Sequence, residues 1–133
     1  MTRDDLIEYA GIYVHNSKLP FYKEQVYNCK CWLLKKDFTS TIVVQSYNTL
    51  AGVYSKETGT LYQFDYYSNT TNRQFRKVAQ LVHADRIVYL YKRPDKAIEY
   101  DCNTGKLWKL SDDDWKKVLE CDFSSYIESK AFR

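Results

Sequence analysis

The sequence contains few of the residues that loosen or interrupt a chain, with four glycines and two prolines among 133 residues, and it has one methionine. So little glycine and proline argues against a disordered or linker-rich protein. No apolar run approaches the roughly 20 residues that a membrane-spanning helix needs, and the first residues lack the basic and then apolar pattern of a secretory leader. We therefore expect a single cytoplasmic domain over residues 1–133, with no membrane partner.

The motifs of the common enzyme classes are missing as well. The chain has no glycine-rich phosphate loop, no Gly-x-Ser-x-Gly nucleophile elbow and no His-Glu-x-x-His zinc motif. Its histidines are His15, in a predicted linker, and His83, at a predicted helix end, where contact with the helix dipole is commoner than base catalysis. A pair of His83 and Cys121 stays open as an alternative, although no motif favours it. We predict a protein that is not an enzyme, with no catalytic residue and no cofactor.

Cysteine occurs at four positions, Cys29, Cys31, Cys102 and Cys121. A cytoplasmic location predicts that all four are reduced. Cys29 and Cys31 alternate along a predicted strand and would share one face, but Cys-x-Cys is not the usual zinc spacing and no second close pair completes a site. We predict ordinary thiols that pack as small hydrophobic side chains, and no metal site.

What the sequence does contain is tyrosine and a mild positive charge. Thirteen tyrosines suit half-buried strands and contact surfaces equally, because each has a large apolar ring with a polar tip. A formal net charge of +3 permits an anionic partner. It argues against a mimic of nucleic acid, which would need a strongly negative surface.

A twelve-residue pattern occurs twice, at residues 51–62 and 97–108. The residues at positions 51, 54, 58, 59 and 61 have counterparts 46 positions later, so that Tyr54 corresponds to Tyr100 and Gly59 to Gly105. A repeated supersecondary unit indicates the architecture more strongly than propensities do. The alternative is that a common hairpin sequence arose twice by chance.

The elements around the repeats complete the predicted order. A helix capped by Thr2, with Leu6 and Ala10 on its apolar face, precedes a strand over residues 26–35. The first unit, residues 41–83, has strands at 41–47, 50–55 and 61–67 and a helix that begins after Ser68. The second, residues 86–128, has strands at 86–91, 96–101 and 106–110 and a helix that begins with the capping box 111–114.

This order predicts an α+β fold. Neither three-stranded unit can bury its apolar face alone, so the two units either pack face to face or join into one sheet. We favour one continuous antiparallel sheet built from two βββα repeats, with both repeat helices on one side. An N-terminal segment, residues 1–40, supplies the preceding helix and strand. Phe75 and Trp115 begin the apolar stripes of the two repeat helices and are expected to lie in the core.

The residues between the first repeat's strands and its helix carry a further pattern. Ser46-Tyr47-Asn48-Thr49 is followed, after a hairpin, by Tyr67-Ser68-Asn69-Thr70-Thr71-Asn72-Arg73. Over about residues 42–82 the chain thereby resembles a family of small uncharacterised phage and mobile-element proteins of Gram-positive bacteria. That family shares a Ser-Tyr-x-Thr, hairpin, Tyr-Ser-x-Thr-Thr-x-Arg-His pattern, and Gln74 stands where it usually has histidine. The resemblance implies a phage or mobile-element origin, and some phage proteins of this kind inhibit host defence systems, including CRISPR nucleases.

Two groups of residues are candidates for binding. Ser68, Thr70 and Thr71 place three hydroxyls and free backbone N–H groups at one helix N-terminus, with Arg73 on the next turn, which can hold a phosphate or carboxylate. The alternative is that Ser68 only caps the helix, the threonines bond locally and Arg73 pairs with an acid such as Asp65.

The second group is the outer, basic face of the same helix. Its cations lie opposite the apolar stripe, with two tyrosines beside them and further cations in the next hairpin turn, and such a face is either simply solvated or binds anionic partners. The group comprises Arg73, Arg76, Lys77, Tyr66, Tyr67, Lys92 and Arg93.

These features favour binding over catalysis. The leading hypothesis is a protein of the host bacterial cytoplasm that inhibits a host defence protein or protein–nucleic-acid complex, such as a CRISPR effector, by occupying its surface. The first alternative is a nucleic-acid-binding accessory protein that uses the basic helix and tyrosines. The second is a small-ligand binder or cryptic enzyme that uses Ser68, Thr70 and Thr71.

Overall fold

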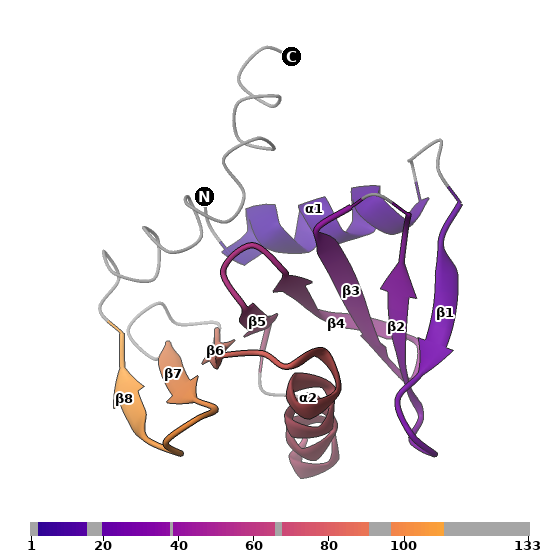
Figure 1. The fold of residues 1–133 in the computed structure, drawn as a ribbon. Coiled ribbons are helices and arrows are strands. Elements are labelled where there is room, and N and C mark those ends of the chain that lie inside the picture. The colour runs from indigo at the N-terminus through magenta and orange to yellow at the C-terminus, as the bar shows by residue number, and fades with distance from the viewer. Residues whose placement is uncertain (1–2, 16–19, 38, 66–67, 91–96, 111–133) are drawn as a thin grey trace.

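The computed structural model describes residues 3–15, 20–37, 39–65, 68–90 and 97–110 (Figure 1). These residues form two helices and one eight-stranded, mostly antiparallel sheet, so the chain has the expected α+β class, with an N-terminal helix before the strands. The described part of the chain contains no helix that is long and apolar enough to cross a membrane. In chain order the elements are α1 (Arg3–His15), β1 (Tyr22–Gln25), β2 (Cys31–Lys35), β3 (Thr41–Ser46), β4 (Thr49–Ser55), β5 (Thr60–Gln63), α2 (Asn69–Val82), β6 (Arg86–Tyr89), β7 (Ile98–Asp101) and β8 (Leu107–Lys109).

The strands lie in the sheet in the order of the sequence, from β1 at one edge to β8 at the other. Neighbouring strands are antiparallel with one exception, because β5 and β6 run parallel. The expectation of a wholly antiparallel sheet is therefore wrong at this pair. The reason is the connection: α2 lies between β5 and β6, and a helical crossover returns the chain so that the next strand runs in the same direction.

The segment expected to be one strand, residues 26–35, is a strand only in its second half, which is β2, whereas residues 26–30 form a turn. The Val26 N–H donates to the Cys31 carbonyl at 2.9 Å and the Cys29 N–H to the Val26 carbonyl at 3.0 Å, which closes a turn between β1 and β2. Tyr27 within this turn has a left-handed backbone, with φ of 50°. The ragged alternation in the sequence thus marks a turn. Cys29 lies in it and Cys31 in β2, so the two thiols do not share a strand face.

The two helices cover opposite faces of the sheet (Figure 1). On one face Leu6 and Ala10 of α1 pack with Val43, and on the other Phe75 and Val78 of α2 pack with side chains such as that of Leu61. The central strands are consequently buried on both faces, and β3 is a nearly continuous run of buried residues. The prediction that both repeat helices lie on one side of the sheet concerns α2 and a second helix predicted after residue 110, and residues 111–133 lie outside the described part of the chain.

Helix α2 forms as the sequence predicts. The Ser68 Oγ accepts a hydrogen bond from the Thr71 N–H at 3.1 Å, so Ser68 is the N-cap. The helix ends at His83, which adopts a left-handed backbone with φ of 57°, and the Ala84 N–H then donates to the Ala79 carbonyl at 2.9 Å. Phe75 and Val78 are completely buried, which confirms the apolar stripe. Trp115, the other expected core residue, lies outside the described residues.

The two predicted hairpins share their pairing and their turns. Tyr54 lies opposite Leu61 in the β4–β5 pair, and Tyr100 lies opposite Leu107 in the β7–β8 pair. Gly59 and Gly105 both have a positive φ, of 69° and 74°. Burial differs, since Leu61 is completely buried and Leu107 is 58 % exposed.

Substitutions of two glycines, one in β4 and one in α1 as a control, test the contact between β4 and α2. A Cβ atom at Gly52 in β4 would lie 2.2 Å from the Tyr62 carbonyl oxygen and 2.5 Å from Cε1 of Phe75. Gly52→Ala is therefore expected to destabilise the fold by about 1–3 kcal/mol or more. A Cβ atom at Gly11 in α1 would meet no other atom within 4 Å, so Gly11→Ala should stabilise the protein by up to about 1 kcal/mol. Urea unfolding measures both changes, and equal effects at the two positions would contradict the contact between β4 and α2.

Candidate functional site

A buried polar contact joins the β3–β4 hairpin to the first half of α2. The Ser46 hydroxyl donates to Oε1 of Gln74 at 2.6 Å and lies 3.4 Å from the Thr71 hydroxyl. Ser46, Thr71 and Gln74 are each at most 5 % exposed. The two halves of the Ser-Tyr-x-Thr and Tyr-Ser-x-Thr-Thr-x-Arg pattern, far apart in the sequence, are thus brought together in space.

The three hydroxyls that were predicted to form an anion site, those of Ser68, Thr70 and Thr71, have different roles in the structure. The Ser68 hydroxyl lies 3.2 Å from that of Thr71 and caps the helix, and Thr71 is buried. Thr70 is exposed on the first turn of α2. Thr70 is therefore the hydroxyl of the three that is placed to meet a ligand at the surface.

Next to the buried contact lies a small groove, which we call the hairpin–helix groove. It has a volume of about 290 Å³ and is lined by Cys29, Lys30, Tyr47, Thr70, Arg73, Gln74 and Lys77. The first three come from the β1–β2 and β3–β4 turns and the others from α2. The Tyr47 N–H donates to the Lys30 carbonyl at 2.9 Å, which holds the two turns together.

The groove is electropositive. Lys30 approaches it from a turn and Arg73 and Lys77 from α2, and all three side chains are exposed. The sequence of α2 contains no Asp or Glu, so these cations have no acidic neighbour on their own helix. The Nζ atom of Lys77 lies 3.3 Å from the Cys29 sulfur.

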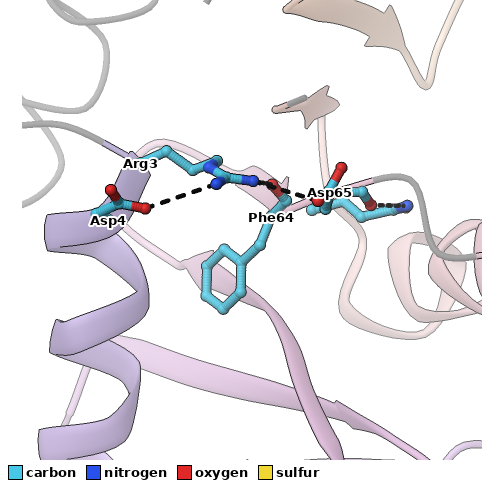
Figure 2. A network of polar contacts seen from close by, with 5 residues as sticks. Arg3, Asp4, Phe64 and Asp65 are labelled. Carbon is cyan, nitrogen blue, oxygen red and sulfur yellow. Dashed lines mark hydrogen bonds and ion pairs between the residues drawn. The ribbon is translucent and has the colours of Figure 1, made fainter. Parts of the chain in front are cut away.

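Asp65, the acid considered as a partner for Arg73, lies against the other helix. Nη1 of Arg3, at the start of α1, is 3.3 Å from Oδ2 of Asp65 and 3.4 Å from the Phe64 carbonyl oxygen. Figure 2 shows the Arg3 side chain reaching from α1 toward these two residues. Among the described residues, the ion pairs involve Arg3, Lys35 and Arg86, and not the cations of the groove.

Two exposed tyrosines stand on the turns beside these cations. Tyr27 is 55 % and Tyr47 50 % exposed, and both have a left-handed backbone, with φ of 50° and 54°. Tyr47 is the first residue of the two-residue loop between Ser46 and Thr49, where Gly, Asn or Asp is usual. A bulky residue in this conformation is strained, and such strain is concentrated at functional sites.

The chain matches the model of a family described as being of unknown function, DUF8033, over residues 13–93. The chain belongs to this family. The matched segment of the DUF8033 protein contains every residue of the hairpin–helix groove. No curated protein and no solved structure matches the chain.

Arg76 of this DUF8033 protein lies apart from the groove, in a second pocket at the other end of α2. Its guanidinium stands 4.7 Å above the ring of Tyr100, and the pocket of about 600 Å³ also includes His83, Asp85 and Cys102. Arg76 is exposed, as expected for the outer face, but the ring contact gives it a structural role. The outer face of α2 is thus divided between two pockets.

Two of the thiols, those of Cys31 and Cys102, have a raised pKa. Burial raises the pKa of the Cys102 thiol, and the carboxylates of Asp101 and Asp85 raise it further. Burial raises the pKa of Cys31 to about 12, with a smaller contribution from Cys29. A raised pKa keeps a thiol protonated at neutral pH and disfavours a nucleophilic role. Within the described residues no group of three or more side chains is placed to hold a metal ion.

Sequence reasoning missed part of the groove and named some residues that lie outside the described part of the chain. Lys30 and Cys29 were missed because they were assigned to a strand, although the broken alternation around them could have indicated a turn. Thr70, Arg73 and Lys77 come together at the groove, whereas Ser68 and Thr71 take structural roles. Outside the described residues are Tyr66, Tyr67, Lys92, Arg93 and Cys121.

Two substitutions of Gln74 test the buried hydrogen bond. One of them introduces histidine, the residue that the phage family usually has at this position. In Gln74→His, a ring nitrogen of the imidazole can accept the hydrogen bond from the Ser46 hydroxyl. The free energy of unfolding of this variant should therefore lie within about 1 kcal/mol of that of the parent. Gln74→Met has a similar length but no strong acceptor, and it should cost about 1–3 kcal/mol. Chemical denaturation compares the two variants, and a Met variant as stable as the His variant would contradict a structural role for the hydrogen bond.

Proposed function

We propose that this protein is a non-catalytic binding protein of phage or mobile-element origin that inhibits a host defence component, such as a CRISPR effector, in the host bacterial cytoplasm. It does so by occupying an anionic part of that component through the hairpin–helix groove. The observation that carries the proposal is the meeting of Lys30, Arg73 and Lys77 in one groove beside a helix without acidic residues. The resemblance of residues 42–82 to phage proteins supports the choice of partner.

The side chains of the groove support binding better than catalysis. Among the described residues, the lining includes three cations, a hydroxyl, a phenol, an amide and a thiol, and no Asp, Glu or His. General acid–base catalysis most often uses His or a carboxylate whose pKa is adjusted to the reaction. Cations, by contrast, attract an anionic partner from a distance and raise its rate of association.

We also infer that residues 86–128 form a second βββα unit equivalent to residues 41–83. The support is the shared pairing of Tyr54 with Leu61 and of Tyr100 with Leu107, together with the positive φ of both turn glycines. In this arrangement the exposed Leu107 is the counterpart of the buried Leu61.

Charge reversal in the groove tests the proposed function. The parental protein, expressed in Gram-positive strains that each carry one CRISPR type, should restore plaque formation by a phage that a spacer targets. Arg73→Glu with Lys77→Glu should lose most of this effect, because reversal replaces attraction with repulsion. Both side chains are exposed, so the free energy of unfolding should change by no more than about 0.5 kcal/mol.

The matched control is Lys106→Glu with Lys109→Glu. It makes the same change in net charge at exposed positions of the last hairpin and should retain parental activity. Two results would reject the proposal: no restoration of plaques by the parental protein in any strain, or equal restoration by the groove variant and the control.

A further inference from the structure

We propose that the hairpin–helix groove binds single-stranded nucleic acid, with a phosphate among Lys30, Arg73 and Lys77 and a neighbouring base stacked on Tyr47. This inference rests on the proposed binding role of the groove and names the chemistry of its partner. A guide strand or a displaced target strand in a defence complex presents both of these groups.

The groove has the charge and the size for a phosphate. Its cations come from two sides, Lys30 from the β1–β2 turn and Arg73 and Lys77 from successive turns of α2, and Thr70 adds a hydroxyl donor. Phosphate contacts in nucleic-acid complexes are made by these side-chain types. The volume of about 290 Å³ lies at the lower end for ligand pockets, which suits a phosphate and its sugar better than a larger ligand.

Tyr47 supplies the second half of the site. This residue is half exposed and lines the same groove as the cations. Tyr27 is exposed on the adjoining turn, and the hydrogen bond from the Tyr47 N–H to the Lys30 carbonyl holds the two turns together. A glycine at position 47 would relieve the left-handed backbone. A tyrosine at this strained position is explained if its ring is needed at the surface.

This pairing of cations and an exposed ring favours a single strand over other anionic partners. Binding of single strands combines a positively charged groove with aromatic side chains on which bases stack. A duplex keeps its bases stacked inside, so the ring of Tyr47 would have no base to meet. An acidic peptide would use the cations but would leave the strained aromatic residue unexplained.

The test is fluorescence anisotropy of the full chain with a labelled oligothymidylate of about 12 nucleotides. We expect binding that is tighter than for a duplex of the same length or an oligoglutamate peptide. The affinity should fall about tenfold between about 50 and about 200 mM salt, as expected when two or three phosphates are neutralised. Lys106→Glu with Lys109→Glu is the control and should bind almost as the parent does.

Two variants separate the phosphate contact from the stacking contact. Arg73→Glu with Lys77→Glu should weaken binding at least about tenfold and flatten the salt dependence. Tyr47→Gly should weaken binding about tenfold with little change in the salt dependence, and its melting temperature should not fall, because the strained backbone is relieved. If Tyr47 had only a structural role, the melting temperature of Tyr47→Gly would fall.

The experiments distinguish a failure of the single-strand inference from a failure of the proposed function. No binding of the oligothymidylate, or parental affinity of Tyr47→Gly, would overturn the nucleic-acid assignment. Equal or tighter binding of oligoglutamate would replace it with an acidic protein surface. If the charge-reversed variant lost plaque restoration while the parent bound no oligonucleotide, the proposed function would stand and the single-strand inference alone would be wrong.

Discussion

The hydrogen bond between Ser46 and Gln74 is the contact on which the candidate site depends. It fixes the β3–β4 hairpin to the second turn of α2 at 2.6 Å. Because both groups are buried, either one would be left without its partner if the helix slid along the sheet, and an unpaired buried polar group costs about 1–3 kcal/mol. The apolar contact of Phe75 over Gly52 is non-directional, whereas this bond selects one register. The distance between Tyr47 on the hairpin and Arg73 on the helix is set by it.

Helix α2 consequently has three surfaces with separate tasks. Its apolar stripe, with Phe75 and Val78, is completely buried against the sheet. Its N-terminal polar side, through Thr71 and Gln74, sets the register. The exposed residues of α2 are cations and neutral polar residues, and the cations repel one another when no anion is near. Packing and hydrogen bonding thus hold a positive surface together at an electrostatic cost, and an anionic partner would remove that cost.

The sequence was sufficient for elements whose signals are local. The cap at Ser68, the apolar stripe of α2 and the hairpin turn at Gly59 depend on residues within a few positions of one another, and the structure has all three. It was insufficient where the outcome depends on distant partners. The parallel pairing of β5 with β6 follows from the path of the crossover, and no residue type encodes it. Lys30 reaches the groove only because the β1–β2 turn lies beside the β3–β4 turn, which requires the sheet order to be known.

The pattern shared with the phage proteins can be divided by what each residue does in the fold. Ser46, Ser68 and Thr71 form the buried contact and the helix cap, so folding alone accounts for them. Tyr47 and Arg73 are exposed, and folding does not account for them; the backbone at Tyr47 is even strained by its side chain. Both of these residues line the same groove. Together with the exposed Thr70, they therefore lie on one surface, as residues that bind a partner would, whereas the exposed Thr49 of the pattern is not part of that surface.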